Sequence, residues 1–265
     1  MKNKPIGIFD SGVGGLTVLK EIEKILPYED IVYFGDTARV PYGNKSKSTI
    51  IKFSIENILF LLRKKIKIVV VACNTSSSLA LDYLKKTFNI PILGVIKAGI
   101  RKAIEVSKNK RIGIIGTQAT IESKSYQKQI LKKDKTIKVY AHSCPLFVPL
   151  VEEGIVHGKI VREIIRIYLK PLKEKGVDTL ILGCTHYPLL KKEIGLYLKR
   201  VNIINSAEQV ALYVKDILKK KNILNDKRRS RKIDFYLTDE VKNFLKLARL
   251  FLKREISKPK IINNV

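Results

Sequence analysis

The chain has 265 residues, enough for one large domain or two small ones with a buried core. It carries 52 basic and 24 acidic residues, a net charge of +28, and three cysteines. This odd cysteine number without a C-x-x-C spacing excludes a disulfide framework and a local zinc or redox motif. No apolar run approaches the roughly 20 residues that span a bilayer, and Asp10 interrupts the first apolar run, which argues against a signal peptide. We therefore expect a cytoplasmic protein with reduced thiols.

Strand and helix signals alternate along the chain, a pattern typical of a mostly parallel sheet covered by helices. In the first half, the predicted elements in chain order are strand 6–9, helix 16–26, strand 31–34, helix 47–64, strand 67–72, helix 77–88, strand 92–95 and helix 98–106. In the second half, they are strand 111–115, helix 120–132, strand 137–141, helices 147–153 and 156–175, strand 178–182, helix 188–199, strand 201–204, helix 208–221, strand 233–237 and helix 240–253.

Two short segments look like copies of each other. Residues 68–75 read IVVVACNT and residues 179–186 read TLILGCTH, so each is an apolar strand followed by a small residue, a cysteine and a polar residue. Residues 6–11 and 112–117 form a second pair of copies at a similar separation. The duplication predicts an α/β fold of two pseudo-symmetric parallel-sheet lobes. The two thiols should then face each other across the cleft between the lobes, at the carboxyl ends of their strands.

The last elements of the chain have no counterpart in the second copy. We therefore expect strand 233–237 and helix 240–253 to pack on the first lobe, which makes that lobe discontinuous. On this interpretation the first lobe comprises residues 1–97 and 208–265, and the second lobe comprises residues 98–207.

The basic residues are spread over the whole chain, largely on the polar faces of predicted helices. The densest run, residues 219–232, holds eight basic residues and one acid, Asp226, and is interpreted as a flexible connector. A surface of this charge could bind nucleic acid. Since no nucleic-acid motif accompanies it, a solvated lysine-rich surface is favoured, and a nucleic-acid-binding protein stays an alternative.

Two loops follow the first two predicted strands. Residues 10–16 read DSGVGGL, but Thr17 stands where the third glycine of a dinucleotide-binding G-x-G-x-x-G belongs. The glycines are interpreted as relieving backbone strain in a strand-to-helix turn, whereas Asp10 could orient an ammonium group or assist a thiol. Residues 35–43 read GDTARVPYG, a loop at a strand end, where ligand contacts accumulate.

A single buried cysteine is usually core filler, but two at equivalent strand ends favour a catalytic pair. Cys144 has no counterpart in the first half and is predicted to be structural. His186 lies two residues from Cys184. A metal site has little support, because Cys73, Cys184 and His186 lack a second histidine or acid at a spacing that zinc sites favour.

The chain resembles the glutamate racemases of the cofactor-independent aspartate/glutamate racemase superfamily along essentially its full length. The matching stretches, in order, are residues 8–19, 33–43, 72–75, 144–154 and 183–190. The resemblance implies that Cys73 and Cys184 are catalytic acid/bases. One thiolate removes the α-proton of glutamate, and the opposite thiol returns a proton to the other face. Cys184 would act on the L-isomer and Cys73 on the D-isomer.

The same resemblance assigns supporting roles. It implies that Asp10 assists Cys73 and His186 assists Cys184, with Asp36 and Glu152 as secondary assistants. Each thiol is also expected near a helix N-terminus, whose dipole favours a thiolate. The glutamate-binding residues that it implies are Asp10, Ser11, Pro41, Tyr42, Gly43, Cys73, Asn74, Thr75, Thr117, Thr120, Cys184, Thr185 and His186.

The chain departs from the family pattern at Asn205, where aspartate is expected, and at Lys97-Ala98, which lacks a common proline. The resemblance implies no cofactor, neither pyridoxal phosphate nor metal. It implies glutamate as the small-molecule partner and a role for D-glutamate in peptidoglycan synthesis, and it is compatible with a homodimer. A racemase of another small acidic amino acid is the alternative within the superfamily.

Overall fold

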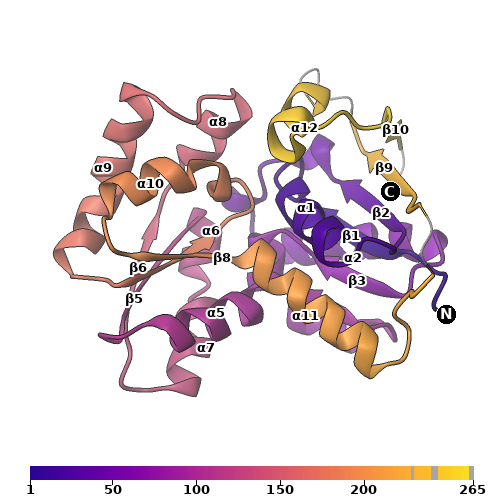
Figure 1. Cartoon of the computed structure of the whole chain (residues 1–265), viewed down its shortest axis with the longest axis horizontal. Coiled ribbons are helices and arrows are strands. Elements are labelled where there is room, and N and C mark those ends of the chain that lie inside the picture. The colour runs from indigo at the N-terminus through magenta and orange to yellow at the C-terminus, as the bar shows by residue number, and fades with distance from the viewer. Residues whose placement is uncertain (228–229, 240–243, 263–265) are drawn as a thin grey trace.

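The computed structural model describes residues 1–227, 230–239 and 244–262, which form two α/β lobes side by side (Figure 1). The first lobe contains a six-stranded sheet in the order β10-β9-β2-β1-β3-β4, and the second a four-stranded sheet in the order β6-β5-β7-β8. All neighbouring strands in both sheets are parallel. The predicted fold class is confirmed.

The element bounds are as follows. The strands are β1 (Ile6–Asp10), β2 (Ile31–Gly35), β3 (Ile68–Val71), β4 (Ile92–Gly94), β5 (Arg111–Gly116), β6 (Lys138–Ser143), β7 (Thr179–Gly183), β8 (Asn202–Asn205), β9 (Ile233–Leu237) and β10 (Lys260–Ile261). The α-helices are α1 (Leu16–Ile25), α2 (Lys47–Arg63), α3 (Asn74–Leu79), α4 (Leu81–Thr87), α5 (Val95–Val106), α6 (Gln118–Glu122), α7 (Ser125–Lys133), α8 (Phe147–Glu152), α9 (Lys159–Glu174), α10 (Lys191–Tyr197), α11 (Ser206–Lys220) and α12 (Phe244–Leu252). Three 3₁₀ turns are η1 (Thr37–Arg39), η2 (Tyr42–Asn44) and η3 (Tyr187–Leu190).

The duplication predicted from the sequence is present in the sheet topology. The order β2-β1-β3-β4 in the first sheet is the same as β6-β5-β7-β8 in the second. Every residue of β1, β2, β3 and β7 is buried, which explains their nearly continuous apolar sequences, because helices cover both faces of a parallel sheet. Cys73 follows β3 and Cys184 follows β7, so the two thiols occupy equivalent strand ends.

Several predicted helices are shorter or broken. The helix expected over residues 77–88 is divided into α3 and α4 at Ala80, and the one over 120–132 into α6 and α7, where Lys124 adopts a left-handed conformation with φ 54°. The helix expected over 188–199 begins as the 3₁₀ turn η3 before α10. Hydrophobic periodicity predicts that a helix is present, but it does not predict such local breaks.

The C-terminal elements extend the first sheet. Strand β9 pairs with β2, and β10 pairs with β9. Helix α12 packs against α1, and α11 packs against α1 and α5 between the two lobes (Figure 1). The predicted boundaries after residues 97 and 207 fall inside α5 and α11, and the division into lobes at those residues stays a prediction.

The predicted basic connector is anchored where the structure describes it. The Asn225 N–H donates to Glu29 Oε1 at 2.8 Å, and Arg231 pairs with Glu23 at 3.3 Å. These contacts correct the prediction of a flexible connector. Arg228 and Arg229, and the first four residues of the helix predicted over 240–253, lie outside the described residues.

Membrane-spanning helices are absent from the described ranges. Within residues 1–227, 230–239 and 244–262, no helix has the length and apolarity needed to cross a bilayer.

Candidate active site

A cavity of about 450 Å³ lies between the lobes, and both Cys73 and Cys184 line it. Its walls come from loops at the carboxyl ends of strands in both sheets, the usual ligand position in open α/β folds. Cys144 is fully buried and does not line the cavity. The duplicated strands therefore bring two of the three thiols to one site.

Most of the predicted site residues line this cavity. They are Ser11, Pro41, Tyr42, Gly43, Cys73, Asn74, Thr75, Thr117, Glu152, Cys184, Thr185 and His186. Asp10 and Thr120 do not; both are fully buried behind the wall. Asp10 accepts from the Gly12 N–H at 3.1 Å and from the Thr185 hydroxyl at 3.4 Å, so it supports the wall rather than forming it.

The Cys184 side of the cavity contains a thiol, an imidazole and a carboxylate in series. Cys184 Sγ lies 3.8 Å from His186 Nδ1, and His186 Nε2 lies 3.0 Å from Glu152 Oε1. Burial lowers the pKa of His186, but its hydrogen bonds and charge interactions with Cys184 and Glu152 outweigh burial and raise the pKa to about 10. An imidazolium beside this sulfur favours negative charge on it.

The glycine loop fits closely against this histidine. A Cβ atom on Gly14 would lie 2.5 Å from His186 Nδ1 and 2.3 Å from Thr185 Oγ1. Neither Gly12, Gly14 nor Gly15 has a positive φ. The interpretation that these glycines relieve backbone strain is therefore wrong. Gly14 is needed because the second lobe approaches the first-lobe backbone too closely for a side chain.

The Cys73 side of the cavity is built differently. Cys73 occupies the N-cap position of α3, whereas Cys184 precedes the 3₁₀ turn η3, with His186 at the cap. The expectation that both thiols lie at helix N-termini therefore holds in full only for Cys73. Burial, with a further contribution from the charge of Asp10, raises the pKa of Cys73 to about 12.

Asp10 is electrostatically connected to both sides. Burial raises its pKa, whereas the charge of His186 and hydrogen bonds from Gly12, Gly15 and Thr185 act in the opposite direction. The charge of Asp10 also raises the pKa of Cys73. Its carboxyl group therefore interacts with His186 on one side of the cavity and with Cys73 on the other.

Neutral donors surround the cavity between the thiols. Asn74 Oδ1 accepts from the Tyr126 hydroxyl at 2.6 Å, which orients the amide NH₂ for other acceptors. The hydroxyls of Thr75 and Thr117, from different lobes, lie 3.1 Å apart, and Thr120 lies 3.3 Å from Thr75. Such groups can solvate a carboxylate in a closed pocket without carrying charge.

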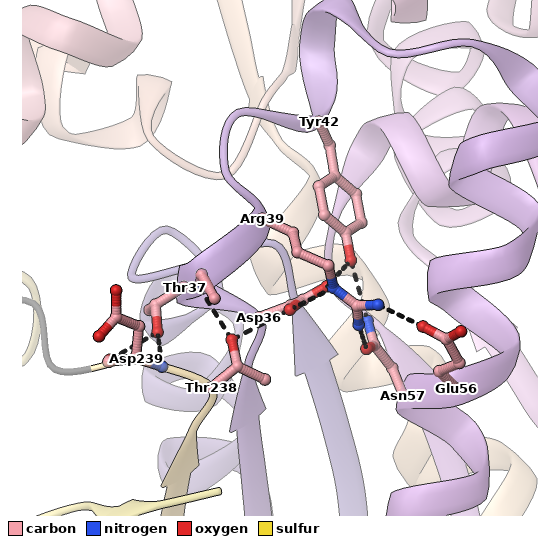
Figure 2. A network of polar contacts seen from close by, with 9 residues as sticks. Asp36, Thr37, Arg39, Tyr42, Glu56, Asn57, Thr238 and Asp239 are labelled. Atoms are coloured by element: carbon pink, nitrogen blue, oxygen red, sulfur yellow. Dashed lines mark hydrogen bonds and ion pairs between the residues drawn. The ribbon is translucent and has the colours of Figure 1, made fainter. Parts of the chain in front are cut away.

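Asp36 is the centre of a separate polar network, the Asp36 network, beneath the wall that Tyr42 forms (Figure 2). The buried carboxylate accepts from the Tyr42 hydroxyl, from Arg39 Nε at 2.7 Å and from the Thr238 hydroxyl at 3.0 Å. Arg39 also pairs with Glu56. Asp36 does not line the cavity and supports the loop, and its expected role as a secondary assistant stays a prediction.

The Tyr42 hydroxyl makes its hydrogen bonds within the Asp36 network and not toward the cavity. It donates to Asp36 and accepts from Asn57 Nδ2 at 3.2 Å. Any ligand contact from Tyr42 must therefore use its ring or backbone.

Several lining residues were not predicted. They are Val40, Asn44, Gln118, Pro145, Val148, Pro149 and Glu153. Most of them belong to or adjoin the motif stretches 33–43 and 144–154. The sequence motifs therefore identified these loops, but they did not show which of the side chains face the cavity. Within the described residues, no group of three or more His, Cys, Asp or Glu side chains is placed to hold a metal ion.

The departure at Asn205 has a structural consequence that is small. Asn205 is the N-cap of α11, and its Oδ1 accepts from the Ala207 N–H at 3.1 Å. Asparagine and aspartate cap helices about equally well. The substitution therefore preserves the start of the helix that bridges the lobes.

Comparison with known proteins gives consistent matches. The family model described as Asp/Glu/Hydantoin racemase matches residues 6–212. The glutamate racemase of Persephonella marina is 52% identical over 256 residues, covering 97% of this chain and 96% of the relative. That of Aquifex aeolicus is 50% identical over 260 residues, covering 98% of each chain. A crystal structure of the Francisella tularensis glutamate racemase with D-glutamate superposes with a TM-score of 0.93 at 40% identity, covering 99% of this chain and 98% of that one.

Proposed function

This chain belongs to the Asp/Glu/Hydantoin racemase family, and on that premise we propose that it interconverts L-glutamate and D-glutamate through Cys73 and Cys184. The observation that carries the proposal is one cavity lined by two thiols from equivalent strand ends of two lobes. Racemisation needs an acid and a base on opposite faces of the α-carbon, and this arrangement supplies both.

In the L-to-D direction, Cys184 as thiolate removes the α-proton and becomes a thiol. The Cys73 thiol then protonates the other face of the α-carbon and becomes a thiolate. In the D-to-L direction the roles exchange. One C–H bond breaks and one forms, no electrons are transferred, and the enzyme ends each turnover with its proton moved from one sulfur to the other.

The electrostatics of the two sides suit this cycle. With a pKa of about 12, Cys73 holds a proton at neutral pH and can serve as the acid for L-glutamate. The His186 cation, supported by Glu152, lies 3.8 Å from the opposite sulfur. Asp10, behind the cavity wall, raises the pKa of Cys73 by its charge and so helps this thiol to hold its proton, and its contact with glutamate stays a prediction.

The neutral donors bind the carboxylates of glutamate. We assign the carboxylates to the side chains and backbone of Ser11, Gly43, Asn74, Thr75, Thr117 and Thr185. Hydroxyl, amide and N–H donors stabilise the negative charge that develops on the α-carboxylate during proton removal. Pro41 and the Tyr42 ring complete the wall, and Thr120 holds the hydroxyls of Thr75 and Thr117 in place.

The proposal extends to the setting of the enzyme. D-Glutamate serves peptidoglycan synthesis. The three cysteines form no disulfide, which is usual in a reducing compartment and supports a cytoplasmic location. A homodimer stays a prediction, and sedimentation equilibrium measures it.

The direct test is exchange and racemisation in deuterated water. Protein dialysed against a chelator, without pyridoxal phosphate, is incubated with L-glutamate while the α-proton signal is followed by NMR and D-glutamate by chiral chromatography. We expect loss of the α-proton together with appearance of D-glutamate. Activity that vanished on chelation and returned with metal would contradict the proposal, as would the absence of exchange.

A further inference from the structure

A buried hydroxyl next to the first thiol has no partner. Ser76 is fully buried, and its Oγ makes no hydrogen bond to any described residue. Leaving a buried polar group unpaired is costly, so native proteins rarely do so. The backbone of Ser76 is used normally, since its carbonyl accepts from the Ala80 N–H at 2.9 Å. The hydroxyl is therefore available to donate to a neighbouring acceptor.

The position of Ser76 in α3 indicates that partner. Cys73 is the N-cap residue, with extended backbone at φ −61° and ψ 123°, and Ser76 is the third residue of the helix. In a capping box, the N-cap side chain accepts from the backbone N–H of that third residue, whose own side chain reaches back to the N-cap. Here the N-cap side chain is a thiol that makes no cap hydrogen bond in this structure, and the backbone N–H and hydroxyl of Ser76 are the donors that a capping box would offer to its sulfur.

We propose that Ser76 is a positioning residue of the racemase, whose hydroxyl and backbone N–H donate to the sulfur of Cys73 when that sulfur is a thiolate. The inference rests on the proposed function of Cys73. It assigns to Ser76, on the first side of the cavity, the stabilisation that His186 provides on the second side.

The surroundings of Cys73 explain the need for such donors. Burial and the charges of Asp10 and Cys184 raise the pKa of Cys73, and the nearby backbone and side-chain donors of Ser76 oppose that rise. The other titratable group facing it is Tyr33, whose hydroxyl is already committed to the Gly12 carbonyl at 2.6 Å. Of the neighbouring ionisable groups, Asp10 and Cys184 thus oppose negative charge on the Cys73 sulfur, and the Tyr33 hydroxyl already donates its hydrogen bond to another acceptor.

The second copy of the motif, around Cys184, has no serine at the position equivalent to Ser76. The residue three positions after Cys184 is Tyr187, whose hydroxyl donates to the Cys144 carbonyl at 2.9 Å. Cys184 has His186 beside it instead. The two halves of the duplicated chain therefore stabilise their thiolates by different means, one with neutral donors and one with an imidazolium.

Thiol labelling tests the inference without turnover. Wild type, Ser76→Ala, Ser76→Thr and Ser78→Ala are treated with iodoacetamide at pH 8.5, and labelling of each cysteine is followed by peptide mapping. Ser78 is the matched control, because its Oγ is also buried and unpartnered in the same helix. We expect Ser76→Ala to slow labelling of Cys73 about fourfold. A one-unit rise in pKa reduces the thiolate tenfold, and the higher nucleophilicity of the remaining thiolate offsets part of this.

Labelling of Cys184 and of the Ser76→Thr variant completes the test of Ser76. Labelling of Cys184 should stay unchanged, and Ser76→Thr, which keeps the hydroxyl, should restore the rate at Cys73. Equal effects of Ser76→Ala and Ser78→Ala, or equal slowing at Cys73 and Cys184, would overturn the inference. Since labelling needs no substrate, these results are independent of whether glutamate is racemised, and failure of the proposed function would appear only in the deuterium experiment.

Discussion

The two sides of the cavity share one topology and differ in their chemistry. Cys73 and Cys184 follow equivalent strands, β3 and β7, of two sheets with the same strand order. Cys184 is the thiol of a thiol–imidazole–carboxylate series that continues through His186 to Glu152. Cys73 is instead buried at the N-cap of α3 beside Asp10. The repeated topology thus places the two thiols at equivalent positions, while the residues around each thiol differ.

Removing either thiol should abolish nearly all racemase activity. We expect Cys73→Ser and Cys184→Ser each to reduce racemisation by at least about 10³-fold, because every turnover needs a base on one face and an acid on the other. Cys144→Ser should leave turnover nearly intact, since Cys144 lies outside the cavity. Chiral chromatography of the product measures all three. Full racemase activity in either of the first two variants would refute the assignment.

The same variants can separate the two faces. With a substrate analogue that carries a leaving group at the β-carbon, elimination needs mainly the abstracting base. Each variant should then retain elimination for the enantiomer whose α-hydrogen faces the remaining thiol, so the enantiomer preference inverts between the variants. Equal loss for both enantiomers in both variants would contradict opposed single-face bases.

Replacing the imidazole should test whether the second side depends on its cation. We expect His186→Asn to lower kcat/KM about 100-fold. The loss must be equal in both directions, because the enantiomers have equal free energies. His142→Asn is the control, since His142 packs against Tyr168 and does not line the cavity. Initial-rate kinetics with each enantiomer give the result, and a change no larger than in the control would show that Cys184 works without its histidine.

Loss of the Asp36 carboxylate should weaken substrate binding rather than chemistry. In Asp36→Asn the Tyr42 hydroxyl, Arg39 and Thr238 lose a charged acceptor, so the cavity wall is held less firmly. We expect KM for glutamate to rise about tenfold with an unchanged pH profile. Asp226→Asn, an exposed acid paired with Lys2, serves as the control. A displaced pH profile at unchanged KM would instead indicate that Asp36 assists proton transfer.

The smallest expected effect is a shift of pH dependence in Glu152→Gln. The hydrogen bond and charge of Glu152 raise the pKa of His186, and burial lowers it. Without that charge the histidine loses its proton at lower pH, so the alkaline limb of kcat/KM should move down by about one pH unit. Glu153→Gln, which also changes a lining carboxylate, is the control. An alkaline limb that stayed in place or moved upward would exclude this role.

The sequence alone determined the architecture and the positions of the two candidate thiols. Apolar strands ending in Ala-Cys-Asn and Gly-Cys-Thr, repeated at equivalent places, specified two parallel sheets and put Cys73 and Cys184 at their carboxyl ends. These features are local and periodic, so they can be recognised without long-range information. The family motifs also identified the loops that line the cavity.

Only the tertiary structure decided how the side chains of those loops are used. Asp10 and Thr120 lie behind the wall, the Tyr42 hydroxyl is held by Asp36, and Gly14 is required by the approach of His186. Each of these facts depends on a contact between segments distant in sequence or on the direction of one side chain in a packed interior. Local pattern does not encode such contacts, because burial and partner geometry arise only when the two lobes close against each other.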